Sequence, residues 1–347
     1  MKRLMEAAVI ASALRFVALA LMLLPALAKA DPITLKFSFF TSDRSLIYQC
    51  QIKPFVDAVN AEGASLVQIK VYFSGAISRN QAEQPRLVRE GIADIANVAP
   101  GYLPKSFPDT SALELPGMFR DPREASLVFT HLVEAGALEG YKNFFAVGTF
   151  VSAGESIHSR KPITSLADLK GQKIRVNNEI EAATLQKFGA VPILLPLNHA
   201  MEALSKGQID SVTIPPSMLF EFGYGRLTSH HYLLQLGGAP VTLLMSRNKL
   251  MALPPHAQEI IRKYSGGWLA EREAACFAES DREVVARLKA DARRTVVEPS
   301  PADLATARKV FASVVDEWAS ESPHHRELLT LVQAELRKLR SSTGNSK

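Results

Sequence analysis

The feature that most limits how this chain can fold is an alternation of β-rich runs with amphipathic helical segments, which occurs twice along the sequence. The β-rich runs predict strands at 33–39, 66–73, 92–98, 144–151, 174–176, 191–195 and 210–214. The segments between them predict helices at 45–59, 81–90, 179–188 and 199–206. Strand–helix–strand order at this spacing favours right-handed crossovers and a mostly parallel sheet. The sequence therefore predicts an α/β protein built from two such units.

Two further segments connect these units. A return strand is predicted at 241–246, and a long helical stretch from Pro254 to about 292 has one weak point at Gly266-Gly267. A final amphipathic helix with a basic end is predicted at 327–340. We expect a bilobed protein, with crossing segments between two α/β lobes and a long helix near the C-terminus. The expected ranges are 1–30 for a signal peptide, 31–152 and 241–280 for lobe I, 153–240 and 281–334 for lobe II, and 335–347 for a tail. Ligands of open α/β sheets bind beyond the carboxyl ends of strands, so both lobes offer strand ends to a shared cleft.

The first thirty residues predict export. Lys2 and Arg3 precede an apolar run at 16–28, and Ala28-Lys29-Ala30 has the small-x-small pattern of a cleavage site. An uncleaved anchor is the alternative, but the run is shorter than the roughly 20 residues that span a bilayer. Residues 1–30 carry four basic and one acidic side chain, so their removal lowers the formal charge from +5 to +2. A charge this small gives no indication of a nucleic-acid partner.

The cysteines and histidines give no indication of a metal or redox centre. Cys50 and Cys276 allow one disulfide in an exported protein, but their separation leaves this open, and we expect two buried free thiols. The adjacent His230 and His231 lack the spacing of a metal site, as does the isolated His158, and we expect solvent-exposed or hinge histidines. The sequence predicts no cofactor.

Several ordered motifs carry a family resemblance. The stretch 161–176, KPITSLADLKGQKIRV, resembles the signature segment of substrate-binding proteins of tripartite ATP-independent periplasmic (TRAP) transporters. Further matching segments follow in the same order at 188–192, 203–210 and 253–255, and others precede it at 91–95, 107–108 and 114–116. The resemblance runs from about residue 33 to 292, which is nearly the whole mature chain.

The resemblance implies a periplasmic receptor, a monomer, that closes on a small organic acid and delivers it to TRAP membrane subunits. The family's hallmark arginine, which pairs with a substrate carboxylate, falls on Arg175. A guanidinium offers two parallel donors that match a carboxylate, and the helix N-terminus near Asn177 also favours an anion. From the residues alone, a structural arginine paired with Asp168 or Glu179 remains the alternative.

Two departures from the family pattern indicate the kind of acid. Many members that bind sialic acid or dicarboxylates have a second arginine where this chain has Gly154, and an Asn-Pro where this chain has Pro215-Pro216. The cleft is therefore expected to be less polar than in those members. We predict a monocarboxylate with an apolar or aromatic body, such as an aromatic or 2-oxo acid.

The remaining candidate ligand contacts lie at predicted strand ends. Phe40, Tyr102 and Phe220 are expected to form apolar walls, with lobe core as the alternative for the two phenylalanines. Asn97 and Ser152 are candidate hydrogen-bonding residues, or else they satisfy loop backbone. Pro215 follows the last strand of its unit and completes the predicted set.

Two other functional classes remain open at this stage. An exported enzyme on the same scaffold would need a nucleophile–base pair or a metal cluster, and no such motif is found. A receptor that serves a sensor protein instead of a transporter cannot be distinguished by this sequence. Arg293-Arg294 and the basic C-terminus are too sparse for a nucleic-acid site. The sequence therefore predicts a binding protein without catalytic activity.

Overall fold

A computed structural model describes residues 31–344, so the predicted signal peptide (1–30) lies outside the described residues. Eleven strands form two sheets within this range. The first sheet has the order β2–β1–β3–β10–β4, made by β1 (Ile33–Ser38), β2 (Val67–Tyr72), β3 (Ile95–Val98), β4 (Phe144–Val151) and β10 (Pro240–Ser246). The second has the order β11–β9–β5–β8–β6–β7, made by β5 (Ser156–Ser159), β6 (Lys173–Val176), β7 (Val191–Leu194), β8 (Ser211–Ile214), β9 (His230–Tyr232) and β11 (Thr295–Val297).

Strand direction confirms the expected α/β class. β1 is parallel to β2 and β3, and β6 is parallel to β7 and β8. The strands that return from the other lobe are antiparallel to their neighbours: β10 lies between β3 and β4, and β5 lies between β8 and β9. Each sheet therefore has three parallel strands on one side, and the next strand is antiparallel and belongs to a segment that has crossed between the lobes.

Several helices that pack on the two sheets begin at polar caps. Asp121, Asn178 and Ser300 accept hydrogen bonds from backbone amides in the first turns of α4, α5 and α11. The helices around the first sheet are α2 (Lys53–Glu62), α3 (Gln84–Arg89), α4 (Pro122–Glu134), α8 (Arg247–Met251) and α9 (Pro255–Lys263). Those around the second are α5 (Glu179–Lys187), α6 (Leu197–Ser205) and α7 (Met218–Glu221), with α11 (Pro301–Ser320) packed against α5.

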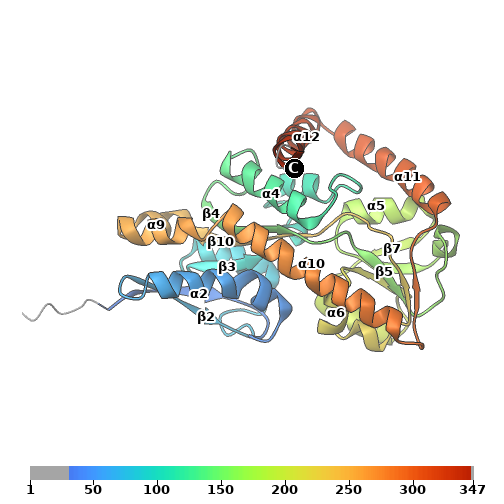
Figure 1. Ribbon diagram of the computed structural model, residues 1–347, viewed down its shortest axis with the longest axis horizontal. Coiled ribbons are helices and arrows are strands. Elements are labelled where there is room, and N and C mark those ends of the chain that lie inside the picture. Colours follow the sequence, from blue (N-terminus) through green and yellow to red (C-terminus); the bar gives the residue numbers. More distant parts are fainter. Residues whose placement is uncertain (1–30, 345–347) are drawn as a thin grey trace, which may run out of the picture.

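One long helix, α10 (Gly267–Ala290), runs from the first lobe to the second (Figure 1). Its Leu269 packs in the core of the first lobe, and its Phe277 and Leu288 pack in the core of the second. The predicted weak point is confirmed, because the helical stretch is broken between α9 and α10 where Gly266 has a φ of +59°. The exact lobe boundaries stay a prediction.

The C-terminal segment differs from the expectation. Residues 335–347 were assigned to a tail and 323–334 to lobe II, but α12 (Pro323–Gly344) is one helix that packs on α4 of the first lobe. Leu328, Val332 and Leu336 are buried in that lobe's core, and Arg340 forms an ion pair with Glu124. The expected helix at 327–340 is confirmed, but the assignment of 335–344 to a tail was wrong, and the sequence does not show that this helix packs on a surface some 200 residues earlier in the chain.

The cysteines also differ from the expectation of free thiols. Cys50 and Cys276 form a disulfide, with their Cα atoms 5.5 Å apart. The bond fastens the short helix Tyr48–Ile52 of the first lobe to the middle of α10. The sequence could not show this, because the two positions are 226 residues apart and meet only through the packing of α10.

His158 and His231 form a buried pair, so the expectation of exposed or hinge positions was wrong for both. Their Nδ1 atoms are 2.8 Å apart, and His158 Nε2 lies 3.2 Å from the Ile214 carbonyl. A neutral pair satisfies these contacts, because His158 Nε2 then donates to the carbonyl and its Nδ1 accepts from His231. Burial lowers the pKa of His158 to about 4 and that of His231 to about 3.

Candidate functional site

A cavity of about 140 Å³ lies between the lobes, where the strand ends of both sheets meet. It continues into a wider cleft of about 1340 Å³ that reaches Trp318 of α11. Seven of the eight predicted contact residues line the cavity: Phe40, Asn97, Tyr102, Ser152, Arg175, Asn177 and Pro215. An apolar cavity of about 150 Å³ is known to hold benzene, so this one has room for a single ring.

Arg175 is the only basic side chain among the described residues that line the cavity. It is 0% exposed and projects from β6, the central parallel strand of the second sheet. The predicted alternative, an ion pair with Asp168 or Glu179, is not formed, because Asp168 instead caps the short helix Leu166–Leu169. Within 31–344, Arg175 forms no ion pair at all.

The guanidinium of Arg175, which lines the cavity, is hydrogen-bonded through three of its donors. Its Nε donates to the Leu195 carbonyl at 2.8 Å, its Nη1 to the Thr213 carbonyl at 3.1 Å, and its Nη2 to the Tyr102 hydroxyl at 3.1 Å. A guanidinium has five N–H donors, so one on Nη1 and one on Nη2 have no partner in the described chain. Two donors on the terminal nitrogens match the two oxygens of a carboxylate.

Tyr102 joins the lobes at this point. It lies in the short helix Pro100–Tyr102, directly after β3 of the first lobe, and accepts from Arg175 of the second. The same hydroxyl donates to Asn177 Oδ1 at 3.3 Å. Burial raises the pKa of Tyr102, so the hydroxyl keeps its proton at neutral pH. Tyr102 therefore holds both Arg175 and Asn177 in place from across the cleft.

Aromatic rings form much of the remaining wall, but one was predicted wrongly. Phe150 and Phe277 stack with ring centroids 4.5 Å apart, and they line the cavity together with Phe40 and Phe222. Phe220 does not line it; its ring lies under the guanidinium of Arg287 on another side of the lobe. Phe220 and Phe222 are two positions apart in or beside the four-residue α7, so they face opposite ways.

The two polar candidates bond within the protein. Ser152 Oγ accepts from the Ala239 amide at 2.9 Å and thereby joins the two crossing segments between the lobes. Asn97 Nδ2 donates to Gln51 Oε1 at 2.6 Å, on the buried wall opposite the second lobe. Ser152 thus satisfies loop backbone, which was the alternative for it, whereas Asn97 bonds another side chain; both residues also line the cavity.

The acidic lining was missed by sequence reasoning. Glu114, Glu155 and Asp281 line the cavity, as does Gln51 next to the disulfide. Burial raises the pKa of Glu114 to about 8, and burial also raises the pKa values of Glu155 and Asp281. The one available signal was position: Glu155 directly follows Gly154, the position where related proteins have a second arginine.

Gly154 lies where a larger side chain does not fit. A Cβ at this position would lie 2.6 Å from the Leu236 carbonyl oxygen and 2.8 Å from Gln235 Cβ. The crossing segment that contains Leu236 lies this close because the Leu236 amide donates a hydrogen bond to the Glu155 carbonyl, with 3.0 Å between nitrogen and oxygen. The close approach of the two crossing segments therefore leaves no room for an arginine side chain at position 154.

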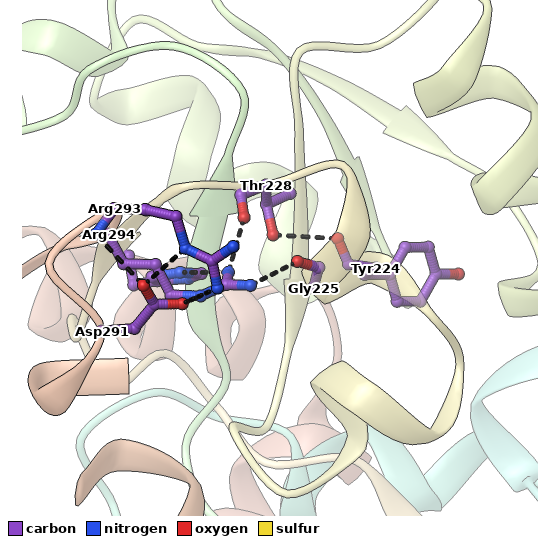
Figure 2. A network of polar contacts seen from close by, with 7 residues as sticks. Tyr224, Gly225, Thr228, Asp291, Arg293 and Arg294 are labelled. Carbon is purple, nitrogen blue, oxygen red and sulfur yellow. Dashed lines mark hydrogen bonds and ion pairs between the residues drawn. The ribbon is translucent and has the colours of Figure 1, made fainter. Parts of the chain in front are cut away.

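The other arginine cluster has a structural role (Figure 2). Arg294 donates to the carbonyls of Thr228 and Gly225 at 2.8 and 2.7 Å, and Asp291 pairs with both Arg293 and Arg294. These contacts fasten the segment after α10 to the loop after α7. In residues 31–344, no group of three His, Cys, Asp or Glu side chains comes together as a metal site. No helix in that range is long and apolar enough to cross a membrane.

The chain matches one family model and is similar in sequence to several known proteins. The family model DctP, described as "Bacterial extracellular solute-binding protein, family 7", matches residues 37–322. The uncharacterized protein YiiZ of Salmonella typhimurium is 26% identical over 269 residues, covering 73% of this chain and 81% of its own length. The C4-dicarboxylate-binding periplasmic protein DctP of Rhodobacter capsulatus is 24% identical, covering 68% of this chain and 72% of its own.

Some of the solved structures with this fold hold aromatic acids. A TRAP solute-binding protein from Rhodoferax ferrireducens, with copurified benzoate, is 27% identical with a TM-score of 0.81 and covers 90% of this chain and 99% of its own. A marine metagenome protein with 3-hydroxybenzoate is 24% identical with a TM-score of 0.82, covering 89% and 99%. One from Bordetella bronchiseptica with bound mandelate is 21% identical with a TM-score of 0.77, covering 89% and 100%.

Proposed function

The chain belongs to family 7 of the bacterial extracellular solute-binding proteins, and we propose that it captures a small monocarboxylate with an apolar or aromatic body for a TRAP transporter. The observation that carries this proposal is that Arg175 is buried without an acidic partner within ion-pair distance among the described residues. This cation lines a cavity with room for one ring, and two of its N–H donors have no partner among those residues either. A carboxylate is the group that completes such an arrangement.

The rest of the cavity favours one carboxylate over two. Arg175 is the single basic residue among the described residues of the lining, and the backbone around Gly154 leaves no room for another. The rings of Phe40, Phe150 and Phe277 offer an apolar surface to the body of the ligand. Benzoate and 3-hydroxybenzoate, held by two proteins of the same fold, have this chemistry.

We further propose that the protein works in the periplasm as a monomer, without a cofactor. Ligand binding would close the lobes about the crossing segments and α10, as in other hinged binding proteins. The closed form would then be recognised by the membrane subunits of the transporter, and the acid would be passed on unchanged. Residues Asn97, Ser152, Asn177 and Pro215 would complete the contact surface as lining residues.

A ligand screen tests the proposal. Protein purified from the periplasm should gain thermal stability with benzoate, 3-hydroxybenzoate or mandelate, and much less with succinate, sialic acid or galacturonate. Calorimetry then measures the affinity of each acid that stabilises the protein, and mass spectrometry of the recovered ligand should show no conversion. Stabilisation by dicarboxylates or sugar acids alone would refute the proposed ligand class.

A further inference from the structure

Three buried glutamates lie in or beside the cavity that Arg175 lines. Glu114 follows the short helix Pro108–Leu113 of the first lobe, Glu155 lies in a crossing segment, and Glu181 lies in the first turn of α5. Their residues are 5%, 2% and 4% exposed. A carboxylate-binding site would be expected to exclude acidic side chains, so their presence requires a physical explanation.

Glu155 and Glu181 are joined through one residue. Asn177 donates its side-chain amide to Glu155 Oε1 and its backbone amide to Glu181 Oε2, the latter at 2.8 Å. The second oxygen of each carboxyl group, Glu155 Oε2 and Glu181 Oε1, is buried without a hydrogen-bond partner. A buried carboxylate with an unpartnered oxygen is costly, so two such neighbours cannot both remain ionised.

The surrounding charges limit how many protons the pair can lose. Burial and the charge of Glu181 raise the pKa of Glu155, while Arg175 opposes the rise for both glutamates. The other titratable groups nearby are Glu114, Glu179, Tyr102 and Tyr224, together with Asp281 in the cavity lining, all of them acids. A single positive charge therefore balances a single negative charge, and the pair shares a proton in the ligand-free site.

We propose that Glu155 and Glu181 fix the charge that this site accepts: the pair takes up a proton from solvent when a ligand carboxylate binds Arg175, and it excludes a second ligand carboxylate. The inference rests on the proposed function. A ligand carboxylate that binds the two free N–H groups becomes the counter-ion of Arg175. The negative charge on the Glu155–Glu181 pair then has no positive partner, so the pair takes up a proton. An acid with a second carboxylate brings another charge for which the described lining has no cation.

Calorimetry in buffers of different ionisation heat, phosphate and Tris, measures the proton uptake. With benzoate, the wild type should take up as much as about one proton per ligand between pH 6 and 9, and affinity should fall as pH rises, by as much as about tenfold per unit. The variants Glu155→Gln and Glu181→Gln mimic the protonated group. Each single variant should still take up a proton with benzoate, because the remaining glutamate carries the charge of the pair, and the folded double variant should show no uptake.

Glu179→Gln is the matched control, because Glu179 is an exposed neighbour in the first turn of the same helix. This variant should retain wild-type uptake. Isophthalate, which is benzoate with a second carboxylate, should bind the wild type at least about 100-fold more weakly than benzoate, by analogy with other unpaired buried charges. Thermal midpoints show whether each variant is folded.

Two results would overturn the inference while leaving the proposed function intact: benzoate binding with no proton uptake from pH 6 to 9, or isophthalate binding as tightly as benzoate. Uptake that persists in the folded double variant would also overturn it, since the proton would then go elsewhere. Failure of every monocarboxylate to bind would instead refute the proposed function, and this inference with it.

Discussion

Replacing Arg175 with alanine should remove most of the affinity for monocarboxylates. The side chain is 0% exposed and supplies the only positive charge in the described lining. Removing one partner of a buried charge pair costs about 2–5 kcal/mol, which corresponds to a loss of about 30- to 5000-fold in affinity. The substitution also leaves the acceptors on Leu195 and Thr213 without their donor, so a decrease in stability of about 1–3 kcal/mol is expected.

Titration calorimetry with benzoate and 3-hydroxybenzoate measures this loss, and chemical denaturation measures the change in stability separately. Arg175→Lys keeps the charge but not the two parallel donors, so it should bind with intermediate affinity. Arg294→Lys is the matched control, because Arg294 is also a largely buried arginine bonded to carbonyls, but it lies outside the cavity. An Arg175→Ala protein that is folded and binds within about threefold of wild type would refute the reasoning.

Three further predictions follow from individual contacts. Tyr102→Phe removes the acceptor of Arg175 Nη2 and should weaken benzoate binding about 5- to 100-fold by calorimetry, whereas an unchanged affinity would contradict the bridging role of this hydroxyl. The Cys50→Ala/Cys276→Ala protein should lose about 2–4 kcal/mol in denaturant unfolding but bind benzoate nearly as well, and equal stability would contradict a structural disulfide. The pKa values of His158 and His231 are lower in the folded protein than in the unfolded chain, so the unfolded chain binds more protons as the pH falls. The free energy of unfolding should therefore decrease by about 2–4 kcal/mol from pH 7 to 5 because of this pair. A His158→Asn/His231→Asn protein with the same pH dependence of stability would show that the pair is not the cause.

Local sequence patterns were sufficient for the lobes and for the main cation. Strands such as β1 and β4 show their alternation or apolar character over six or more residues, and Arg175 sits in a recognisable motif at the end of β6. The position of Tyr102 beside Arg175 also follows from topology, because Tyr102 comes shortly after the end of β3 and Arg175 lies near the end of β6, and both strands end at the cleft. These features depend on short stretches of chain and on the general architecture of α/β sheets.

Other features depend on contacts between distant segments. The three-residue β9 and β11 are too short to show a period, and α12 finds its partner only when α4 is in place. The role of Phe220 was wrong because the register of the four-residue α7 decides which ring faces the cavity. Glu155 and Glu181 resemble ordinary surface acids in the sequence, and only the fold brings them together around Asn177.

A crystal structure of the complex with benzoate tests the central claim most directly. The account predicts that both carboxylate oxygens lie within about 3 Å of Nη1 and Nη2 of Arg175, and that the ring packs against Phe150 and Phe277. Benzoate bound elsewhere, or bound with its carboxylate turned away while Arg175 pairs with Glu155, would contradict it.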